Sequence, residues 1–455
     1  MEIFKEPERC YEKACGIDFG SSAIAVAVTS IANPLGAQLV GNLLANETTP
    51  GVIKLYRDVF TVGEDAVATA TICPQNVFSY IPLLLRHADD ISKVKDQFPD
   101  VCYSINIRDD GELYFDVLDD SMFTEIPLVQ IVTVLFKYIR KIVSVQYPDY
   151  LEHTVIALPS DLPACAGGLV LDAACLAGFK DIQLITTVCA QVNHYAFNND
   201  YSKEGDRRIL FVDQGSTFLS IYLLGMGNGQ MNHHRWEYVI GSKELDYYLY
   251  KYFVDKLKGK ADIKPHTKQA IRLMNGCRRL KEMLSAASKA VYTVDGLLDG
   301  DDYQLQLTRA QFEDIIHPWT KNFEEIMEKV KAELTSIEFF KSSDSIEAVE
   351  MIGGGCRVPI LQKIVKDVLG APLRFTVDSA SCIAKGCSLV GLLLKNPDDK
   401  LKASLSLVPI ARANKELYEK NQEICEKITE RTAKQEAKSE MINRFESYCL
   451  YHCQH

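Results

Sequence analysis

The sequence predicts a two-lobed α/β protein in which one architecture occurs twice. The first observation is the stretch GIDFGSS at 16–22, where an apolar strand enters a tight turn with one carboxylate, one glycine and two hydroxyls. An apolar strand at 23–28 leaves this turn, as is typical of a β-hairpin. The second observation is a repeat of the pattern at 209–217, ILFVDQGST, which leads into the apolar strand 218–224. The third is the alternation of strands and helices ahead of the repeat, which indicates an α/β lobe.

Length and composition agree with a large soluble protein. A chain of 455 residues exceeds a single ordinary core, and 47% hydrophobic and 24% charged residues are ordinary for a globular protein. The net charge of −11 argues against a nucleic-acid partner. Residues 1–9 lack the apolar core of a signal peptide, and no apolar stretch is long enough to span a membrane. The 14 cysteines form no C-x-x-C pair, so we expect reduced thiols in a cytoplasmic protein, with the nucleus as a second location.

The first half of the chain continues with strands and amphipathic helices. Apolar residues at helical spacing predict a helix over 127–145, and an apolar run ended by a proline predicts a buried strand over 154–159. We also expect strands at 38–44, 52–56, 59–62 and 182–187, and helices at 164–177 and 190–197.

The second half repeats this arrangement with longer helices. Thr308 is a plausible N-cap because Gln311 follows three residues later. We expect helices at 242–257, 267–287, 309–316, 322–334, 359–369 and 379–394, and strands at 290–294, 303–307 and 348–352.

The composition changes after residue 395. Residues 401–410 predict a short strand or a linker. Residues 411–448 are dense in Glu, Lys, Gln and Arg and carry only a thin apolar seam. This pattern predicts a long surface helix that is marginal unless it docks on something.

The turn at Gly20 has chemistry suited to a phosphate group. Glycine lets the backbone approach a ligand closely, and successive turn N–H groups form a concavity that attracts anions. Asp18 is placed to hold a hydrated Mg²⁺, since this ion prefers one or two carboxylates together with water and phosphate. A short D-x-G turn is common in hairpins, so the second copy at Asp213 carries the argument. The pair predicts a nucleotide clamped between two halves.

A glycine run at 353–355 is the sharpest single feature. It follows a strand and precedes a helix, which places bare backbone and a helix N-terminus beside a ligand. The guanidinium of Arg357 can stack on a purine face. A glycine-rich turn that binds nothing is the alternative, and the two Asp-Gly hairpins make the nucleotide the preferred interpretation.

These motifs resemble those of the 70-kilodalton heat-shock chaperones, within the actin and sugar-kinase superfamily. Residues 16–22 resemble the first phosphate loop, 213–217 the second, and 352–359 the adenosine motif. Further similar stretches lie at 158–160 and 172–179, and those at 240–246 and 383–387 resemble the large 110-kilodalton class more than the ordinary chaperone. The resemblance covers about 14–395 in the right order.

The resemblance implies a two-lobed actin-like ATPase fold with duplicated ribonuclease-H-like subdomains and a C-terminal helical extension. We expect lobe boundaries near 14–205 and 206–375, a closing helix at 379–394, a linker at 396–410 and a helix at 411–455.

The resemblance also implies ATP or ADP with Mg²⁺ between the lobes. Asp18 and Asp213 would order water around the metal. The nucleotide-binding residues would be Gly20, Ser21 and Ser22 on one side of the phosphates, Gly215 and Ser216 on the other, and Gly353, Gly354, Arg357, Lys281 and Ser285 around the adenosine. For Lys281 and Ser285 the alternative is a solvated helix face, because residues four apart share a side in any case.

Three departures from the family pattern bear on catalysis. Ile81 replaces a lysine that supports attack on the γ-phosphate, and Thr187 and Ala380 replace two acidic residues. The second phosphate loop is also slightly shorter than in the family. Phosphoryl transfer depends on positioned charge around the γ-phosphate and the metal. We therefore expect a protein that binds nucleotide and hydrolyses it poorly or not at all, with no confident catalytic residue.

The residues after 395 are too few for the peptide-gripping β-sandwich of the family, so we expect a truncated protein. The leading hypothesis is a nucleotide-binding co-chaperone that promotes nucleotide exchange on a cytosolic 70-kilodalton heat-shock chaperone, with no nucleic-acid or membrane partner. The alternatives are an ATP-dependent chaperone with weak hydrolysis and a nucleotide-free pseudo-ATPase that serves as an interaction scaffold. A sugar kinase is disfavoured because no sugar-binding loop is apparent.

Overall fold

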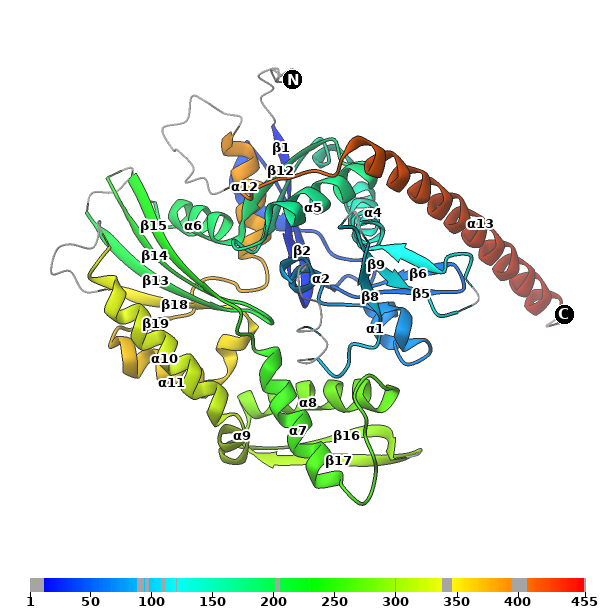
Figure 1. Cartoon of the computed structure of the whole chain (residues 1–455). Coiled ribbons are helices and arrows are strands. Elements are labelled where there is room, and N and C mark those ends of the chain that lie inside the picture. Colours follow the sequence, from blue (N-terminus) through cyan, green and yellow to red (C-terminus); the bar gives the residue numbers. More distant parts are fainter. Residues whose placement is uncertain are drawn as a thin grey trace.

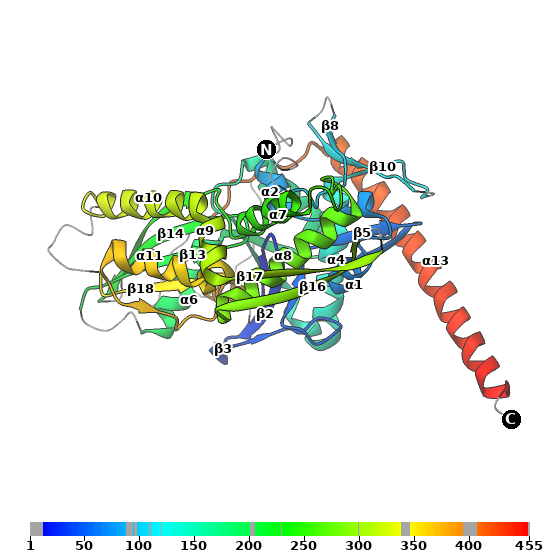
Figure 2. The same cartoon turned by 90° about the horizontal axis from the view of Figure 1, so that it is seen from below.

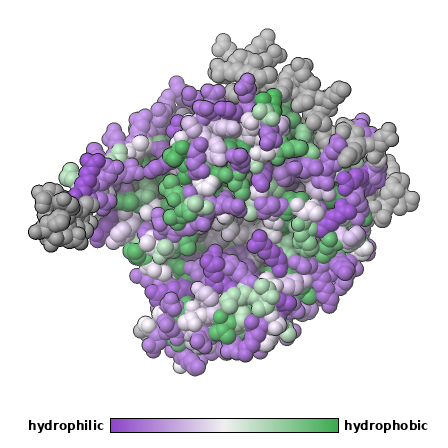
Figure 3. Space-filling model, turned by 180° about the vertical axis from the view of Figure 1, so that it is seen from behind, coloured by the Kyte–Doolittle hydropathy of each residue, from purple (hydrophilic) through white to green (hydrophobic). Residues whose placement is uncertain are grey.

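Two bodies flank a central cleft, and a long helix extends from one of them (Figure 1). The computed structural model describes residues 12–87, 94, 98–108, 111–119, 121–200, 205–228, 230–298, 300–337, 346–394 and 407–453. We call the body built around β1 (Lys13–Phe19) lobe I and the body built around β13 (Arg207–Gln214) lobe II. A view from behind shows a largely hydrophilic surface that is hollowed between its upper and lower parts (Figure 3).

Each lobe contains a sheet with the same strand order. The sheet of lobe I runs β12 (Asp181–Thr186), β11 (His153–Leu158), β1, β2 (Ala23–Ser30) and β3 (Asn33–Leu39), with β4 (Thr48–Pro50) also on β2. The sheet of lobe II runs β19 (Leu373–Arg374), β18 (Ala348–Ile352), β13, β14 (Leu219–Gly227) and β15 (Gln230–Tyr238). Each central strand pairs antiparallel with the next strand in the chain and parallel with a later one. The predicted duplication is therefore present in the fold.

The strand predicted at 38–44 is wrong beyond Leu39. Asn42 causes the break, because its side-chain oxygen accepts hydrogen bonds from the backbone N–H groups of Leu44 (2.9 Å) and Asn46 (3.0 Å). Such side-chain bonding competes with a strand ladder and favours a turn. Ala45 in this turn has a positive φ of 61°.

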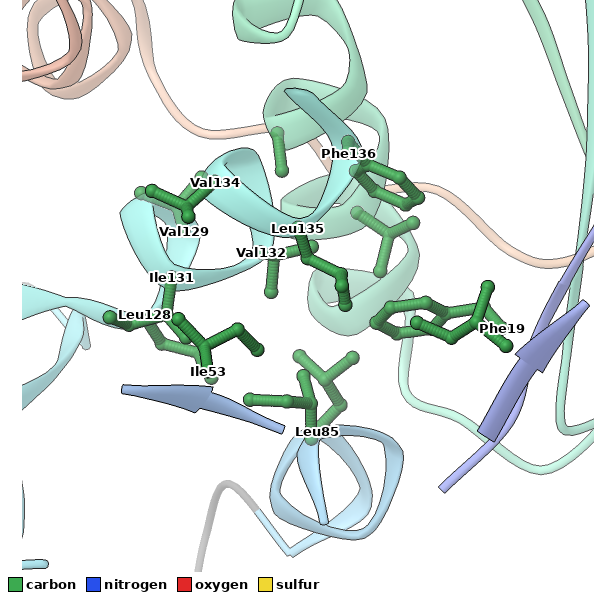
Figure 4. Packing of buried hydrophobic residues seen from close by; sticks show 14 of the residues in the cluster. Phe19, Ile53, Leu85, Leu128, Val129, Ile131, Val132, Val134, Leu135 and Phe136 are labelled. Carbon is green, nitrogen blue, oxygen red and sulfur yellow. The ribbon is translucent and has the colours of Figure 1, made fainter. Parts of the chain in front are cut away.

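Helices cover both faces of the lobe I sheet. α4 (Leu128–Gln146) and α5 (Ala164–Leu176) share a hydrophobic cluster with β1 and β2, and side chains of α4 point toward Phe19, Ile53 and Leu85 (Figure 4). α6 (Thr187–Asn198) and α12 (Cys382–Leu394) cover the other face. Gly16 permits this close packing, because a Cβ there would lie 2.2 Å from the carbonyl oxygen of Ala384.

The rest of lobe I forms smaller sheets and helices beside the cleft. These are β5 (Ile53–Tyr56), β6 (Val59–Val62), α1 (Glu64–Ala68), β7 (Val77–Phe78), α2 (Ile81–Arg86), β8 (Ile105–Ile107), β9 (Leu113–Asp116) and β10 (Glu125–Pro127). Short 3₁₀ helices lie at Pro74–Asn76 and Pro148–Tyr150.

Lobe II carries α7 (Lys243–Leu257), α8 (Lys268–Ala286), the hairpin β16 (Lys289–Leu298) and β17 (Asp301–Thr308), α9 (Arg309–Ile315), α10 (His317–Leu334) and α11 (Pro359–Leu369). The predicted N-cap is confirmed, because the Thr308 side chain and Gln311 form a reciprocal capping box. α10 begins five residues before the predicted start, since Pro318 in its first turn is compatible with a helix N-terminus.

The C-terminal segment docks on lobe I. Leu407 forms a bridge with Ile185 of β12, and Val408 and Ile428 join the hydrophobic cluster of lobe I. α13 (Lys415–Cys453) begins later than predicted, because 411–414 has no regular secondary structure and the Asn414 side chain accepts a hydrogen bond from the N–H of Leu417 (2.8 Å). Most of the predicted linker, 396–406, lies outside the described residues. We call residues 407–431 the strap.

Polar contacts fix the strap. The Gln130 amide of α4 donates to the carbonyl oxygen of Asn421 in the strap (2.7 Å). The guanidinium of Arg431, also in the strap, contacts the Asp58 carboxylate of lobe I (2.9 Å). The outer part of α13 projects away from the body in two perpendicular views (Figures 1 and 2). Among the described residues, no helix combines the length and the apolar character needed to cross a membrane.

Candidate functional site

The cleft between the lobes holds the predicted nucleotide-binding residues. A cavity of about 700 Å³ is lined by both lobes, including Ser21, Ser22, Ser216, Lys281, Ser285, Gly354 and Arg357. An adjoining pocket of about 220 Å³ lies on the phosphate-loop side and is lined by Asp18, Gly20, Gly215, Asp213 and Gly353, as well as by Ser21, Ser22, Ser216 and Gly354. The last four residues line both spaces, so the two adjoin each other. The fold thus brings together every residue that the sequence analysis assigned to nucleotide and metal.

The two phosphate loops face each other as equivalent hairpins. Asp18 lies opposite Ala157 on the parallel neighbour β11, and Asp213 lies opposite Ile352 on β18. The second turn is closed by a hydrogen bond from the N–H of Gly215 to the carbonyl oxygen of Phe218 (2.9 Å). Each lobe therefore presents a carboxylate at a strand end and a turn of small residues to the same space.

The glycine run at 353–355 lies against the second phosphate loop. Gly353 has a φ of 79°, and a Cβ there would lie 2.4 Å from the carbonyl oxygen of Gln214 and 2.6 Å from Oδ1 of Asp213. Both facts restrict this position to glycine. A Cβ on Gly354 would meet nothing within 4 Å, so its backbone borders open space in the cleft. The run continues as a 3₁₀ turn (Gly354–Arg357) into α11, with Arg357 at the cavity wall.

Lys281 and Ser285 project from α8 toward the cavity. The Lys281 ammonium lies 2.8 Å from Oδ1 of Asp246 and donates to the carbonyl oxygen of Ser242 (3.0 Å). Its side chain is only 12% exposed, so Lys281 does not lie on a solvated helix face. The Ser285 hydroxyl donates to the carbonyl oxygen of Lys281 (2.9 Å).

The side chains of Asp18 and Asp213 are partly buried at the wall of the phosphate-side pocket. Burial and the charge of Asp213 raise the pKa of Asp18 to about 7. Burial raises the pKa of Asp213 to about 6, while a hydrogen bond from the Gln191 amide opposes that rise. Two partly buried carboxylates that repel each other are stabilised by a cation, and Mg²⁺ with water and phosphate as further ligands suits them. The donor set therefore fits the implied metal.

Gln191 is a site residue that the sequence analysis missed. It lies one helical turn after Thr187 on α6, so both share the face that borders the carboxylates. Its side chain is buried and donates to Oδ2 of Asp213. The spacing of four residues from Thr187 was the only available signal in the sequence.

The three substituted positions have different surroundings. Thr187 and Ala380 line the phosphate-side pocket. Ile81 is 1% exposed at the start of α2 and belongs to the hydrophobic cluster of lobe I. Two residues before Ala380, the carboxylate of Asp378 accepts hydrogen bonds from the N–H of Ala380 and the hydroxyl of Ser381. This carboxylate therefore stabilises the turn at 378–381. Neither Thr187 nor Ala380 offers the pocket a charge.

A family model described as Hsp70 protein matches residues 14–446. The chain belongs to the Hsp70 protein family. Among similar proteins, heat shock 70 kDa protein 14 of Arabidopsis thaliana is 26% identical over 82% of this chain and 45% of its own length. A heat shock protein homolog of Candida glabrata is 24% identical over 82% of this chain and 54% of its own, and heat shock protein 88 of Dictyostelium discoideum is 24% identical over 82% and 48%. The chain spans about half the length of the curated relatives it matches.

Membership of the Hsp70 family confirms the predicted resemblance and the actin-like ATPase fold. In this family the ATPase domain generally binds ATP or ADP with Mg²⁺. Lys243, Arg278 and Arg279 are further cations on the cavity wall. The sequence motifs assigned a role in nucleotide binding to none of them. Their position depends on how α7 and α8 face α1 and α2 across the cleft, which no local pattern encodes (Figure 1).

Proposed function

We propose that this protein binds ATP or ADP with Mg²⁺ between its lobes and hydrolyses ATP poorly or not at all. We further propose that it acts as a co-chaperone in the cytosol, with the nucleus as a second location, and promotes nucleotide exchange on a 70-kilodalton heat-shock chaperone. The observation that carries the first part is the pair of facing loops, each with a partly buried carboxylate and small residues beside two adjoining cavities.

Nucleotide binding is supported by shape and by charge. A cavity of about 700 Å³ is within the range of ligand sites. Gly354 and the turn residues Ser21 and Ser216 offer backbone and hydroxyl groups, and Arg357 offers a planar cation. A bound Mg²⁺ would neutralise charge on the phosphates. Asp18 and Asp213 would hold the water around it.

Weak hydrolysis is supported by the lost charges. Thr187 and Ala380 place a neutral hydroxyl and a methyl group where the family has carboxylates. Ile81 is buried among apolar side chains and brings no cation to the γ-phosphate. Electrostatic groups of this kind each change rates by about 10²–10³-fold, so their combined loss suppresses turnover more than binding.

The exchange role is supported by family membership and by a docking surface that does not depend on ATP hydrolysis. The strap makes lobe I and the start of α13 one packed body. Lobe I and the start of α13, packed in this way, offer a rigid docking face, and nucleotide bound in the cleft would fix the position of lobe II relative to it.

Release of fluorescent ADP from a purified cytosolic 70-kilodalton chaperone tests the exchange role. We expect this protein to accelerate release in a concentration-dependent manner, whereas an unrelated globular protein of similar charge leaves the rate unchanged. No acceleration over the whole concentration range contradicts the exchange role. Calorimetric titration with Mg-ADP tests nucleotide binding separately.

A nucleotide-free scaffold is the second candidate. It is favoured by the Ser21 and Thr217 hydroxyls, which bond to each other across the loops, and by Lys281, whose ammonium already has protein partners. Thermal unfolding separates the candidates, because a ligand that binds only the folded state must raise its stability. An unchanged melting temperature at millimolar Mg-ADP supports the scaffold.

A further inference from the structure

A short segment of lobe I, residues 99–101, contacts lobe II at three points. The backbone N–H of His266 donates to the carbonyl oxygen of Pro99 (2.7 Å). Nδ1 of His266 lies 2.6 Å from the carbonyl oxygen of Val101, so this nitrogen carries the proton. The Lys243 ammonium lies 3.4 Å from Oδ2 of Asp100. These contacts join the lobes beside the large cavity, which Asp100 and Lys243 line.

The Asp100–Lys243 ion pair is well shielded from water. The side chains are 15% and 10% exposed, and Oδ2 of Asp100 also accepts a hydrogen bond from the Tyr80 hydroxyl (2.9 Å). The Lys243 ammonium lies 5.5 Å from the centre of the Tyr80 ring, and Tyr80 stacks on Phe98. Removing one partner of a shielded pair leaves a buried charge uncompensated. Separation of the lobes would break this ion pair together with the two hydrogen bonds of His266, and these contacts therefore oppose it.

The lobe II ends of these contacts belong to the elements that form the nucleotide cavity. The N–H of Lys243 donates to the carbonyl oxygen of Ser216, so α7 and the second phosphate loop are linked (3.0 Å). His266 directly precedes the N-cap of α8, the helix that carries Lys281 and Ser285. Tyr80, Asp100 and Lys243 line the same cavity as these residues. A movement that breaks the three contacts would therefore also displace residues that line the cavity.

We propose that Pro99, Asp100, Val101, Lys243 and His266 form a clasp that holds the lobes closed over a bound nucleotide and limits the rate at which ADP leaves. This inference rests on the proposed nucleotide binding and adds positioning residues to it. The clasp acts through lobe position, so its loss affects adenosine, ADP and ATP alike. A cation that binds phosphate would instead discriminate among them.

Stopped-flow release of fluorescent ADP from the full chain tests the clasp. We expect Asp100→Asn and Lys243→Met each to accelerate release by about tenfold, the scale of one charge-assisted hydrogen bond. The double variant should be no faster than the single ones, because both remove the same pair. Lys258→Met is the matched control, since it breaks an exposed ion pair with Asp255 within lobe II and should leave release unchanged. His266→Leu, which removes only the ring contact with Val101, provides a milder variant if a charge change impairs folding.

Hydrogen exchange at the His266 amide tests the clasp without nucleotide. We expect this amide, which bonds to Pro99, to exchange faster in Asp100→Asn and Lys243→Met than in the wild type. Release rates within about twofold of the wild type in all variants would overturn the clasp. A second pattern would also overturn the clasp: slower ADP release in Asp100→Asn, together with weaker ATP binding and unchanged adenosine binding in Lys243→Met. That pattern would assign Lys243 to binding of the phosphates. If the wild type binds no ADP, the proposed function fails. In that case, a His266 amide exchange rate that is the same in the wild type and in both charge variants would also reject the clasp as a contact that holds the lobes together.

Discussion

The Thr217 hydroxyl donates a 2.7 Å hydrogen bond to the hydroxyl of Ser21, and this contact joins the two phosphate loops across the cleft. Each hydroxyl comes from the turn of one hairpin in the duplicated fold. Ser21 also lines both the large cavity and the phosphate-side pocket. The contact therefore marks the place where phosphate oxygens would enter between the loops.

Ser21→Ala should weaken Mg-ADP binding and leave adenosine binding unchanged. A hydrogen bond from a hydroxyl to a charged phosphate contributes about 1.5–3 kcal/mol, which corresponds to a loss of roughly tenfold or more in affinity. Calorimetric titration with both ligands measures the difference. Thr217→Ser keeps a hydroxyl at the partner position and serves as the control. An equal loss for adenosine would show that the substitution disturbs the cleft as a whole.

Two neighbouring glycines offer a matched pair of substitutions. Gly353→Ala should destabilise the fold by about 2–4 kcal/mol, because the new Cβ would overlap Gln214 and the φ of 79° disfavours alanine. Gly354→Ala should leave stability within about 0.5 kcal/mol and reduce nucleotide affinity, because its methyl group would point into open cleft space. Urea unfolding and calorimetry measure the two effects. Equal stabilities of the two variants would contradict the packing of Gly353 on Gln214.

Stability should fall as pH rises from about 4 to about 7. The pKa of Asp18 is raised from its ordinary value of 3.8 to about 7, so the folded protein favours the protonated carboxyl. This contribution is fully present below the unfolded value and is lost as pH passes the folded value. The raised pKa of Asp213, about 6, acts in the same direction. Asp18→Asn should reduce the slope and add about 1–3 kcal/mol at pH 8.

Urea unfolding at pH 5.5 and pH 8 measures this dependence. Mg-ADP should raise the melting temperature more at pH 8, where the two carboxylates are charged and repel each other. Gln191→Leu is an informative control, because it removes the hydrogen bond that limits the rise in the pKa of Asp213 and leaves Asp18 in place. A wild-type slope that Asp18→Asn leaves unchanged would contradict the assigned cause.

The duplicated fold was predictable because its signals are local. Each Asp-Gly turn with its flanking apolar strands specifies a hairpin, and the repeat of one pattern specifies two lobes. The turn at the glycine run 353–355 was equally predictable, since a strand, three glycines and a helix follow one another in the sequence. The capping box at Thr308 and Gln311 was another local signal, and the structure contains it.

Contacts between distant segments could not be predicted. The pairing of Asp100 with Lys243 depends on the position of one lobe relative to the other, and although Lys243 lies in the stretch 240–246 that resembles the family, Asp100 lies in no motif. Gln191 lies in a helix predicted from its apolar residues, and its role follows only from the position of Asp213. The thin apolar seam of 411–448 did not allow us to predict whether this helix docks on the rest of the protein. The polar contacts of Asn421 and Arg431 that hold it produce no periodic pattern in the sequence.

Arg431→Met should destabilise the protein by about 1–3 kcal/mol. The side chain of Asp58 is 6% exposed and would lose its cation, and within the described part of the chain its carboxylate would keep the hydrogen bond from the N–H of Met122. Lys415→Met removes an exposed ion pair with Glu419 on the same helix and should cost less than about 0.5 kcal/mol. Urea unfolding compares the two. Equal small effects would mean that the strap adds little to lobe I.

Restoring charge to the phosphate-side pocket should raise ATP hydrolysis. Thr187→Glu with Ala380→Asp returns carboxylates to positions that line the pocket, and we expect single-turnover hydrolysis to increase by about tenfold or more. Ile81→Lys should add to this increase but lower the melting temperature, because Ile81 is 1% exposed and an ammonium there loses its hydration. Ile81→Met is the control, since it keeps an apolar side chain of similar size. An unchanged hydrolysis rate in the triple variant, with ADP still bound, would show that the lost charges do not account for weak turnover.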